Sequence, residues 1–191
     1  MARPKQFDLD QVLDDAMRAF WSKGYMATTA QDLVDSTGLG RGSLYNTFSS
    51  KEVLFQEALR HYDRVWTTRQ EALLAETGSL RDRVRILLMT VVDEETGGNG
   101  NRGCLAVNAA MELAGLDPEV TALVTGIFRR MENALYDAVC RAQADGEIAA
   151  DEDARELALF LLNTMYGLRV LGKSATRTAL TNIVDRTLRL L

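Results

Sequence analysis

Residues 28–52, TTAQDLVDSTGLGRGSLYNTFSSKE, constrain the fold more than any other stretch, because they predict two short helices joined by a tight turn. Thr29 followed three residues later by Asp32 is a capping box, which marks the start of a helix. Gly38 ends that helix, because glycine readily adopts the left-handed backbone through which a chain leaves a helix. A second helix begins directly afterwards. Two helices this short and this close predict a helix-turn-helix unit.

The second helix of this unit has an inner and an outer face. Leu44 and Phe48, one turn apart, are expected to point into the core. The outer face then carries Arg41, Ser43, Tyr45, Asn46 and Thr47. Ser49 and Glu52 form another capping box that starts a third helix, and Lys51 lies in its first turn, where free backbone N–H groups favour a phosphate. The pattern is typical of an element that reads DNA.

The segment resembles the DNA-binding half of TetR/AcrR-family transcriptional regulators. The family pattern of an Asp-aliphatic pair, a turn glycine, G-[ST]-L-Y-x-x-F and S-K-E is matched by Asp32, Leu33, Gly38, Gly42, Ser43, Leu44, Tyr45, Phe48, Ser50, Lys51 and Glu52. The sequence departs from it at Val34, where Ala is usual, at Gly40, where a capping Ser or Thr is usual, and at Thr47, where an aromatic residue or His is common. The resemblance implies an all-α homodimer that represses by binding a roughly palindromic operator and is released by an effector.

By this resemblance, residues 1–52 form a helix-turn-helix DNA-binding domain and residues 53–191 an effector-binding and dimerisation domain, with about nine helices in all. The expected DNA contacts are Thr28, Thr29, Arg41, Gly42, Ser43, Tyr45, Asn46, Thr47 and Lys51. Ahead of the first helix, Arg3 and Lys5 form a short basic arm that is either a disordered end or a contact to DNA phosphates or the minor groove. The competing interpretation is a helical effector-binding or protein-interaction module that does not read DNA.

Total charge counts against a nucleic-acid binder, because the net charge is −5 and the pI is about 5.0. Residues 1–60 hold seven Lys or Arg and eight Asp or Glu, so the N-terminal segment is not basic either. The position of the acidic residues weakens this objection. Asp8, Asp10, Asp14 and Asp15 lie in the first half of the first helix, where their negative charge favours the helix dipole. The salt dependence of DNA binding would separate the two interpretations, because phosphate contacts require a steep negative slope.

The composition favours an all-helical protein, since Ala, Leu, Arg and Glu abound and the chain has two prolines. A single histidine, His61, argues against His-based metal sites and Ser-His-Asp triads, so neither an enzyme nor a metal or other cofactor is expected. Cys104 and Cys140 lack CxxC spacing, and no apolar run approaches the roughly 20 residues of a membrane span. The sequence therefore predicts a protein of the reducing cytoplasm that does not enter a membrane.

Apolar residues at helical spacing predict helices over 8–23, 51–77, 79–94, 102–114, 117–145, 151–171 and 175–191, with a mobile loop, ETGGNGN, at 95–101. The buried stripe expected on the first of these is Leu9, Val12, Leu13, Ala16 and Phe20. No Pro- or Ser-rich linker interrupts the helix that begins at Lys51. The two halves are therefore expected to be mechanically coupled.

Cys104 invites two interpretations. It follows Arg102 at an expected helix start, where the dipole and the cation would favour a reactive thiolate, but cysteine is also among the residues most often buried as a small apolar side chain. The surrounding segment GCLAVNAAMEL resembles a branch of the same family that carries G-C-L-x-x-N-x-x-x-E, some members of which sense electrophiles or oxidants. Both interpretations remain open at the level of sequence.

The C-terminal half offers residues for a pocket and for an interface. A pocket for a small apolar or electrophilic effector is one possibility, although methionines and aromatic residues at helical spacing equally suit a plain core. The residues expected to line such a pocket are Trp66, Met89, Cys104, Asn108, Met111, Phe128, Met131, Phe160, Met165 and Tyr166. The resemblance implies that the last two helices pair with their copies in a four-helix interface. The expected contacts are Phe160, Leu168, Leu180, Ile183, Val184 and Thr187.

Overall fold

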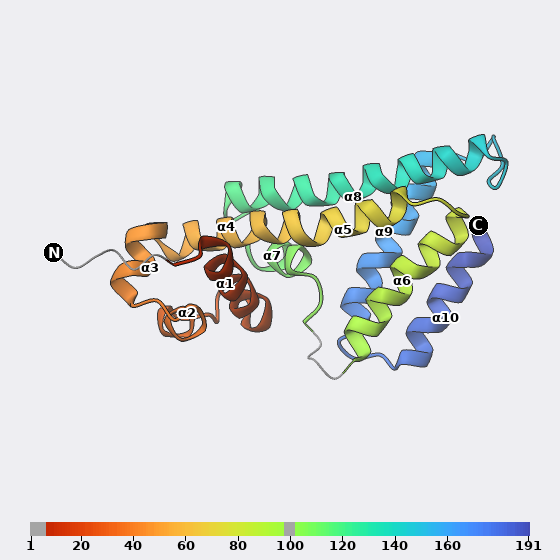
Figure 1. Ribbon diagram of the computed structural model, residues 1–191. Helices are drawn as coiled ribbons and strands as arrows, with labels where there is room; N and C mark the ends of the chain where they lie inside the picture. Colours follow the sequence, from red (N-terminus) through yellow and green to blue (C-terminus); the bar gives the residue numbers. More distant parts are fainter. Residues whose placement is uncertain (1–6, 98–101) are drawn as a thin grey trace.

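A continuous helical rod joins the two halves of the molecule (Figure 1). It consists of α4 (Lys51–Tyr62), a π-helical segment (Asp63–Thr67) and α5 (Thr68–Ala75). The computed structural model describes residues 7–97 and 102–191, and every regular element within those ranges is helical. Counting the rod as one helix gives nine α-helices in the described ranges, as the sequence predicted, followed by a short 3₁₀ turn (Leu188–Leu190).

The N-terminal unit consists of α1 (Leu9–Lys23), α2 (Ala30–Thr37), α3 (Arg41–Phe48) and the start of α4. Its local signals act as predicted. The Thr29 and Asp32 side chains form the capping box of α2, and Gly38 ends α2 in the left-handed conformation at φ 66°. Leu44 and Phe48 are buried beneath α3. The predicted helix-turn-helix is therefore confirmed. Its signals could be recognised in the sequence because caps and turns depend on neighbouring residues alone.

The rest of the described chain folds into long helices arranged around the rod. These are α6 (Leu80–Thr96), α7 (Leu105–Leu113), α8 (Pro118–Ala144), α9 (Ala154–Leu171) and α10 (Arg177–Thr187). Figure 1 shows α8 running alongside α4 and α5, with α6, α9 and α10 bundled at the end away from α3. Most of the predicted ETGGNGN loop, residues 98–101, lies outside the described residues.

The described residues form two apolar cores, and each core joins several helices. The first core joins α1–α4 to α7 and to the first half of α8, up to Ile127. The second core joins α5, α6, α9 and α10 to the remainder of α8, beginning at Met131. Tyr166 packs against both cores. Because α4, α7 and α8 share a core with the N-terminal helices, the two halves are packed together rather than tethered.

Two predicted details of the N-terminal unit are wrong. Leu9 is 48% exposed rather than buried, because it lies at the open end of α1. Ser50 caps α4 by accepting a hydrogen bond from the Val53 N–H, whereas Ser49 leaves α3 with φ 63° and does not cap α4. With two adjacent serines, the backbone geometry after α3 decided which one became the cap.

Candidate DNA interface

The outer face of α3 presents polar side chains that are free to bind a ligand. Arg41, Ser43 and Asn46 are exposed. Within the described residues, no hydrogen bond or ion pair involves these three side chains. Gly42 lies between them, and nothing lies within 4 Å of where its Cβ would be. An open, polar helix face of this kind can enter the major groove of DNA and contact base edges.

The start of α4 places a cation beside that face. The Lys51 Nζ lies 4.4 Å from the centroid of the Tyr25 ring. The Tyr25 hydroxyl donates a hydrogen bond of 3.1 Å to Glu52 Oε1. Burial, followed by this bond to Glu52, raises the pKa of Tyr25 to about 12. Tyr25 is itself held against Phe20 and Phe55, with ring centroids 6.2 and 4.8 Å away. Lys51 therefore lies on a fixed aromatic platform, and no carboxylate of the described residues forms an ion pair with it.

Three predicted threonine contacts differ in how free their hydroxyls are. Thr28 is buried, and its hydroxyl donates to the Gly24 carbonyl at 2.6 Å, so the hydroxyl is already engaged in the turn before α2. Thr29 is exposed but its hydroxyl is part of the α2 capping box. The exposed Thr47 donates to the Ser43 carbonyl at 2.9 Å. Arg3 and Lys5, the predicted basic arm, lie outside the described residues.

Asp32, the partner of Thr29, ties α2 to α1. Its carboxylate forms an ion pair with Lys23 and accepts hydrogen bonds from the Thr29 backbone and hydroxyl. The Lys23 contact and then the Thr29 bonds lower the pKa of Asp32 to about 2. The carboxylate therefore stays ionised near neutral pH, which keeps the negative charge beside α2 neutralised by Lys23.

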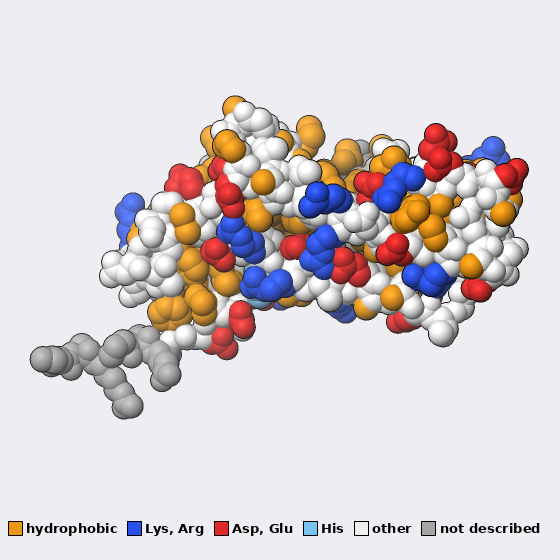
Figure 2. Space-filling model, turned by 90° about the horizontal axis from the view of Figure 1, so that it is seen from above, with side chains coloured by type: hydrophobic (Ala, Val, Ile, Leu, Met, Phe, Trp, Pro, Cys, Tyr) orange, Lys and Arg blue, Asp and Glu red, His pale blue; other side chains and the backbone are white. Residues whose placement is uncertain are grey.

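The long C-terminal helices present no single-sign surface on the face seen from above. Figure 2 shows Lys and Arg side chains interleaved with Asp and Glu along the region of α8. Ion pairs account for part of this pattern, including Arg130 with Asp63 at 2.7 Å and Arg155 with Glu132 at 3.0 Å. Mixed charge of this kind gives little long-range attraction for a polyanion.

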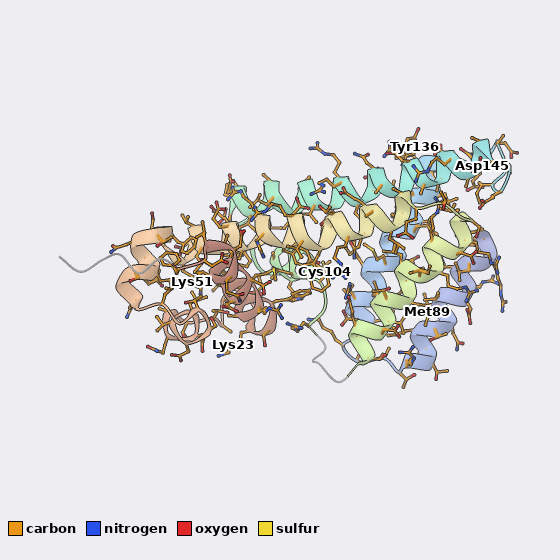
Figure 3. All side chains as sticks on the ribbon, in the orientation of Figure 1. Lys23, Lys51, Met89, Cys104, Tyr136 and Asp145 are labelled. Carbon is orange, nitrogen blue, oxygen red and sulfur yellow. The ribbon has the colours of Figure 1, made fainter. Side chains whose placement is uncertain are left out.

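The predicted effector residues do not converge on one cavity. Cys104 lies near the centre of the molecule, whereas Met89 lies on α6 in the C-terminal bundle (Figure 3). Met131 and Met165 are buried in the second core. Phe128 packs on Tyr166 with ring centroids 4.8 Å apart, and Phe160 is 41% exposed.

The remaining members of that set border separate hollows. Trp66 borders one of about 160 Å³ and another of about 260 Å³. Asn108 and Met111 line an open groove of about 560 Å³ between α1, α7 and the end of α9. The methionines and aromatics at helical spacing thus divide between core and surface, which spacing alone does not distinguish.

Cys104 is buried, as one of its two interpretations required. Its side chain is 4% exposed, and its Sγ lies 3.3 Å from the Tyr62 hydroxyl. Burial, followed by the neighbouring Cys104, raises the pKa of Tyr62 well above its usual value, so Tyr62 stays a neutral phenol. Cys140 is partly exposed, and neither cysteine forms a disulfide.

The sequence pattern did not predict a buried ion-pair network around Arg169. Arg169 is 5% exposed and contacts Glu94 at 2.6 Å and Glu95 at 3.0 Å. Burial lowers the pKa of Arg169, but the charge of Glu94, the neighbouring Tyr62 and Cys104 and the hydrogen bond to Glu95 together leave it above the usual value. The signal was present in the sequence, because Arg169 continues the inward stripe of Leu161 and Leu168 on α9.

Four of the six predicted interface residues belong to the core of the chain itself. Leu168, Leu180, Val184 and Thr187 are at most 3% exposed and cannot present a surface to a second copy. Ile183 is partly buried and Phe160 is exposed. On α9, the exposed large apolar residues are Phe160 together with three that were not predicted, Leu159, Val170 and Leu171.

Within the described residues, no group of three or more His, Cys, Asp or Glu side chains could hold a metal ion. None of the helices in residues 7–97 and 102–191 is long and apolar enough to cross a membrane.

Two family models match the sequence. The model of bacterial regulatory proteins of the tetR family matches residues 12–58, and that of the tetracyclin repressor-like C-terminal domain matches residues 80–183. The HTH-type transcriptional repressor ComR of Escherichia coli is 32% identical over 98% of this chain and 90% of its own length. The HTH-type transcriptional regulator YezE of Bacillus subtilis is 30% identical over the full length of both chains.

Solved structures share the fold. A cysteine mutant of the TetR family regulator CifR, complexed with 26-base-pair operator DNA, superposes with a TM-score of 0.84 at 34% identity over 98% of both chains. A TetR transcriptional regulator from Chloroflexus aurantiacus superposes with a TM-score of 0.83 at 26% identity, over 94% of this chain and 91% of its own.

Proposed function

Because this chain belongs to the TetR family of transcriptional regulators, we propose that it is a cytoplasmic repressor that binds a palindromic operator as a homodimer. An effector in the C-terminal half releases it from the DNA. The observation that carries the proposal is the open outer face of α3. Its Arg41, Ser43 and Asn46 side chains are unpaired among the described residues, and the Lys51 ammonium is held beside it on Tyr25. The similarity to CifR, a mutant of which is complexed with operator DNA, supports operator binding by this chain.

The contacts divide by chemistry. Lys51 and Tyr45 contact phosphates, because a lysine at a helix start adds its charge to the positive end of the helix dipole. Arg41, Ser43 and Asn46 contact base edges, since arginine pairs well with guanine and asparagine with adenine in the major groove. Dispersed phosphate contacts also explain how a chain of net charge −5 can bind DNA, because the attraction depends on the charges at the interface.

The test is salt-dependent binding to the DNA upstream of the protein's own gene. Lys51→Ala should weaken binding to operator and unrelated DNA alike and reduce the slope of log K against log salt by about one. Arg81→Ala is a matched control, because Arg81 is an exposed cation on α6, and α6 belongs to the bundle that lies away from α3 in Figure 1. Unchanged operator affinity in Lys51→Ala would rule out this docking geometry.

Base contacts predict a different phenotype. Asn46→Ala or Arg41→Ala should cost about 1–3 kcal/mol of operator binding and relax the preference at one base pair of each half-site. Binding to unrelated DNA should change little for Asn46→Ala, which removes no charge. Selection of bound sequences from a random pool would reveal the relaxed position. If no DNA is selected by the wild type, the competing interpretation of a protein-interaction bundle is favoured.

The effector is proposed to be a small apolar or electrophilic molecule. We expect Cys104 to react slowly with a thiol reagent in the folded protein, because the thiol is buried against Tyr62. In a Cys140→Ser background, labelling should be at least about tenfold faster in denaturant than in buffer. Cys140, which is partly exposed, provides the fast-reacting reference in a Cys104→Ser background.

The same variants separate the two release routes. If the sulfur is the sensor, Cys104→Ser should abolish release from the operator by a thiol-reactive compound. If a pocket is the sensor, Cys104→Ser should leave release by an unreactive apolar compound intact. Rapid labelling of folded Cys104 would favour the sulfur route.

A further inference from the structure

Glu112, on α7, contacts the turn between α1 and α2 through the backbone. Its Oε2 accepts a hydrogen bond of 2.9 Å from the Met26 N–H, and its Oε1 accepts one of 3.3 Å from the Tyr25 N–H. Hydrogen bonds from N–H groups to an ionised carboxylate are stronger than those to neutral acceptors. One side chain of the C-terminal half therefore holds two consecutive residues of the N-terminal unit.

Gly24 makes this contact possible. Its φ of +80° is a conformation that side chains disfavour, and a Cβ at this position would lie 2.5 Å from Glu112 Oε1. The turn that follows is internally braced, since the Thr28 hydroxyl donates to the Gly24 carbonyl at 2.6 Å. Thr29, next in the chain, caps α2. The carboxylate thus acts on a stiff turn that leads directly into the helix-turn-helix.

A second contact, at the chain segment that leads into α7, holds this part of the C-terminal half to α1. The Trp21 Nε1 donates a buried hydrogen bond of 3.0 Å to the Gly103 carbonyl. The Arg102 guanidinium lies 5.1 Å from the centroid of a Trp21 ring. Asn108 closes the strip on itself by donating to the Arg102 carbonyl at 2.9 Å. Residues 102–112, here called the docking strip, are therefore attached to the N-terminal unit near both ends.

The docking strip is also attached to the ion-pair network of the C-terminal half. The Gly103 N–H donates to Glu95 Oε2 at 3.3 Å, and the other oxygen of Glu95 contacts Arg169. The chain of contacts therefore runs from α9 through α6 and the strip to the turn before α2. The G-C-L-x-x-N-x-x-x-E pattern acquires a physical meaning, because its Gly103, Asn108 and Glu112 all form contacts of this junction.

We propose that Glu112 is a positioning residue for DNA reading, which fixes the orientation of α2 and α3 relative to the C-terminal half and passes movements of α7 to them. This proposal rests on the proposed operator binding. Two recognition helices in a dimer must keep a set separation to engage both half-sites. A loosened turn would widen the distribution of separations without altering the outer face of α3. Binding to a full palindrome should then suffer while binding to one half-site should not.

The first arm of the test needs no DNA. Amide hydrogen exchange of the full-length protein should be several-fold faster at Tyr25 and Met26 in Glu112→Ala than in the wild type, with Glu112→Gln in between. Glu147→Gln is the matched control, because Glu147 also accepts a backbone N–H bond, from Leu80 at 2.7 Å, but at the start of α6. Unchanged exchange at Tyr25 and Met26 in Glu112→Ala would overturn the proposal.

The second arm of the test measures the affinity for operator DNA. Glu112→Ala should bind the palindromic operator about fivefold more weakly than the wild type, near the lower end of typical couplings between sites. Its affinity for a duplex with one half-site should be unchanged, and its penalty for one inserted base pair between half-sites should be smaller. Equal losses on the full and half operators would indicate a merely structural role and overturn the proposal. Failure of the wild type to bind any operator would overturn the proposed function instead, and the exchange arm would still decide whether Glu112 holds the turn.

Discussion

Arg169→Ala is expected to lower the free energy of unfolding by about 3–5 kcal/mol, because removing one partner of a buried ion pair leaves the other charge without compensation. The stranded group is Glu95, whose side chain is 2% exposed, while Glu94 is one-third exposed and can reach water. Among the described residues, Glu95 would then keep only the long hydrogen bond from the Gly103 N–H. Equilibrium denaturation in urea measures the loss.

Arg155→Ala is the matched control for this prediction, since it removes an arginine from the same helix. The Arg155 side chain is 43% exposed, and it pairs with Glu132 at 3.0 Å and stacks on Tyr136 at 3.9 Å. Exposed pairs contribute little, so the cost should be about 1 kcal/mol or less. Equal costs for Arg155→Ala and Arg169→Ala would contradict the argument.

A double variant tests whether the cost arises from the stranded charge. Replacing both Arg169 and Glu95 by methionine should recover much of the loss, because apolar residues of similar volume often substitute well for a buried pair. A double variant less stable than Arg169→Ala would show that the hydrogen bond between Glu95 and Gly103 contributes more than the ion pair. In that case, the docking strip would be the more important structural role of Glu95.

The sequence predicted those features that depend on nearby residues. Gly38 ends α2 because only its own backbone conformation is required, and Leu44 and Phe48 are buried because a helix repeats every 3.6 residues. The position of the outer face of α3 follows from the same periodicity. The helix-turn-helix and its exposed polar residues were therefore predictable without a tertiary structure.

Contacts between distant segments were not predictable in this way. Glu112 lies 87 residues from Tyr25, and nothing in the local pattern of α7 shows which backbone groups it meets. The same limit applies to Thr28, whose hydroxyl donates to the carbonyl of Gly24, four residues earlier. The sequence does not give the shape of the turn that brings these two groups together. Met131 and Met165 illustrate another limit, since helical spacing places a residue on an inward face but does not show whether that face meets a cavity or a neighbour.

Phe160→Asp is expected to convert the protein to a monomer that still folds. Phe160 is 41% exposed within the chain, on the same helix as the exposed Leu159, Val170 and Leu171. Apolar side chains along one helix that no described part of the chain covers are a suitable surface for a second copy. An aspartate on each copy would then have to be buried in the interface without a partner, which association does not tolerate.

The choice of position keeps folding and dimerisation apart. Val184→Asp would also abolish dimers, but Val184 is fully buried in the second core, so the variant should unfold. Phe160→Asp should retain the helical content of the wild type and still unfold cooperatively. Leu116→Asp provides a matched substitution, because Leu116 is 79% exposed between α7 and α8 and lies off α9 and α10.

Loss of the dimer should greatly weaken operator binding. Two N-terminal units joined in one dimer bind a palindrome with an avidity of about 10²–10⁴ over one unit, because the second contact is intramolecular. Phe160→Asp should therefore bind the operator at least about a hundredfold more weakly, with an affinity close to that for a half-site, while Leu116→Asp should bind normally. Sedimentation velocity at micromolar concentration should give a dimer for the wild type and Leu116→Asp and a monomer for Phe160→Asp. A monomeric wild type, or a dimeric Phe160→Asp with full operator affinity, would show that copies of this chain do not associate through α9.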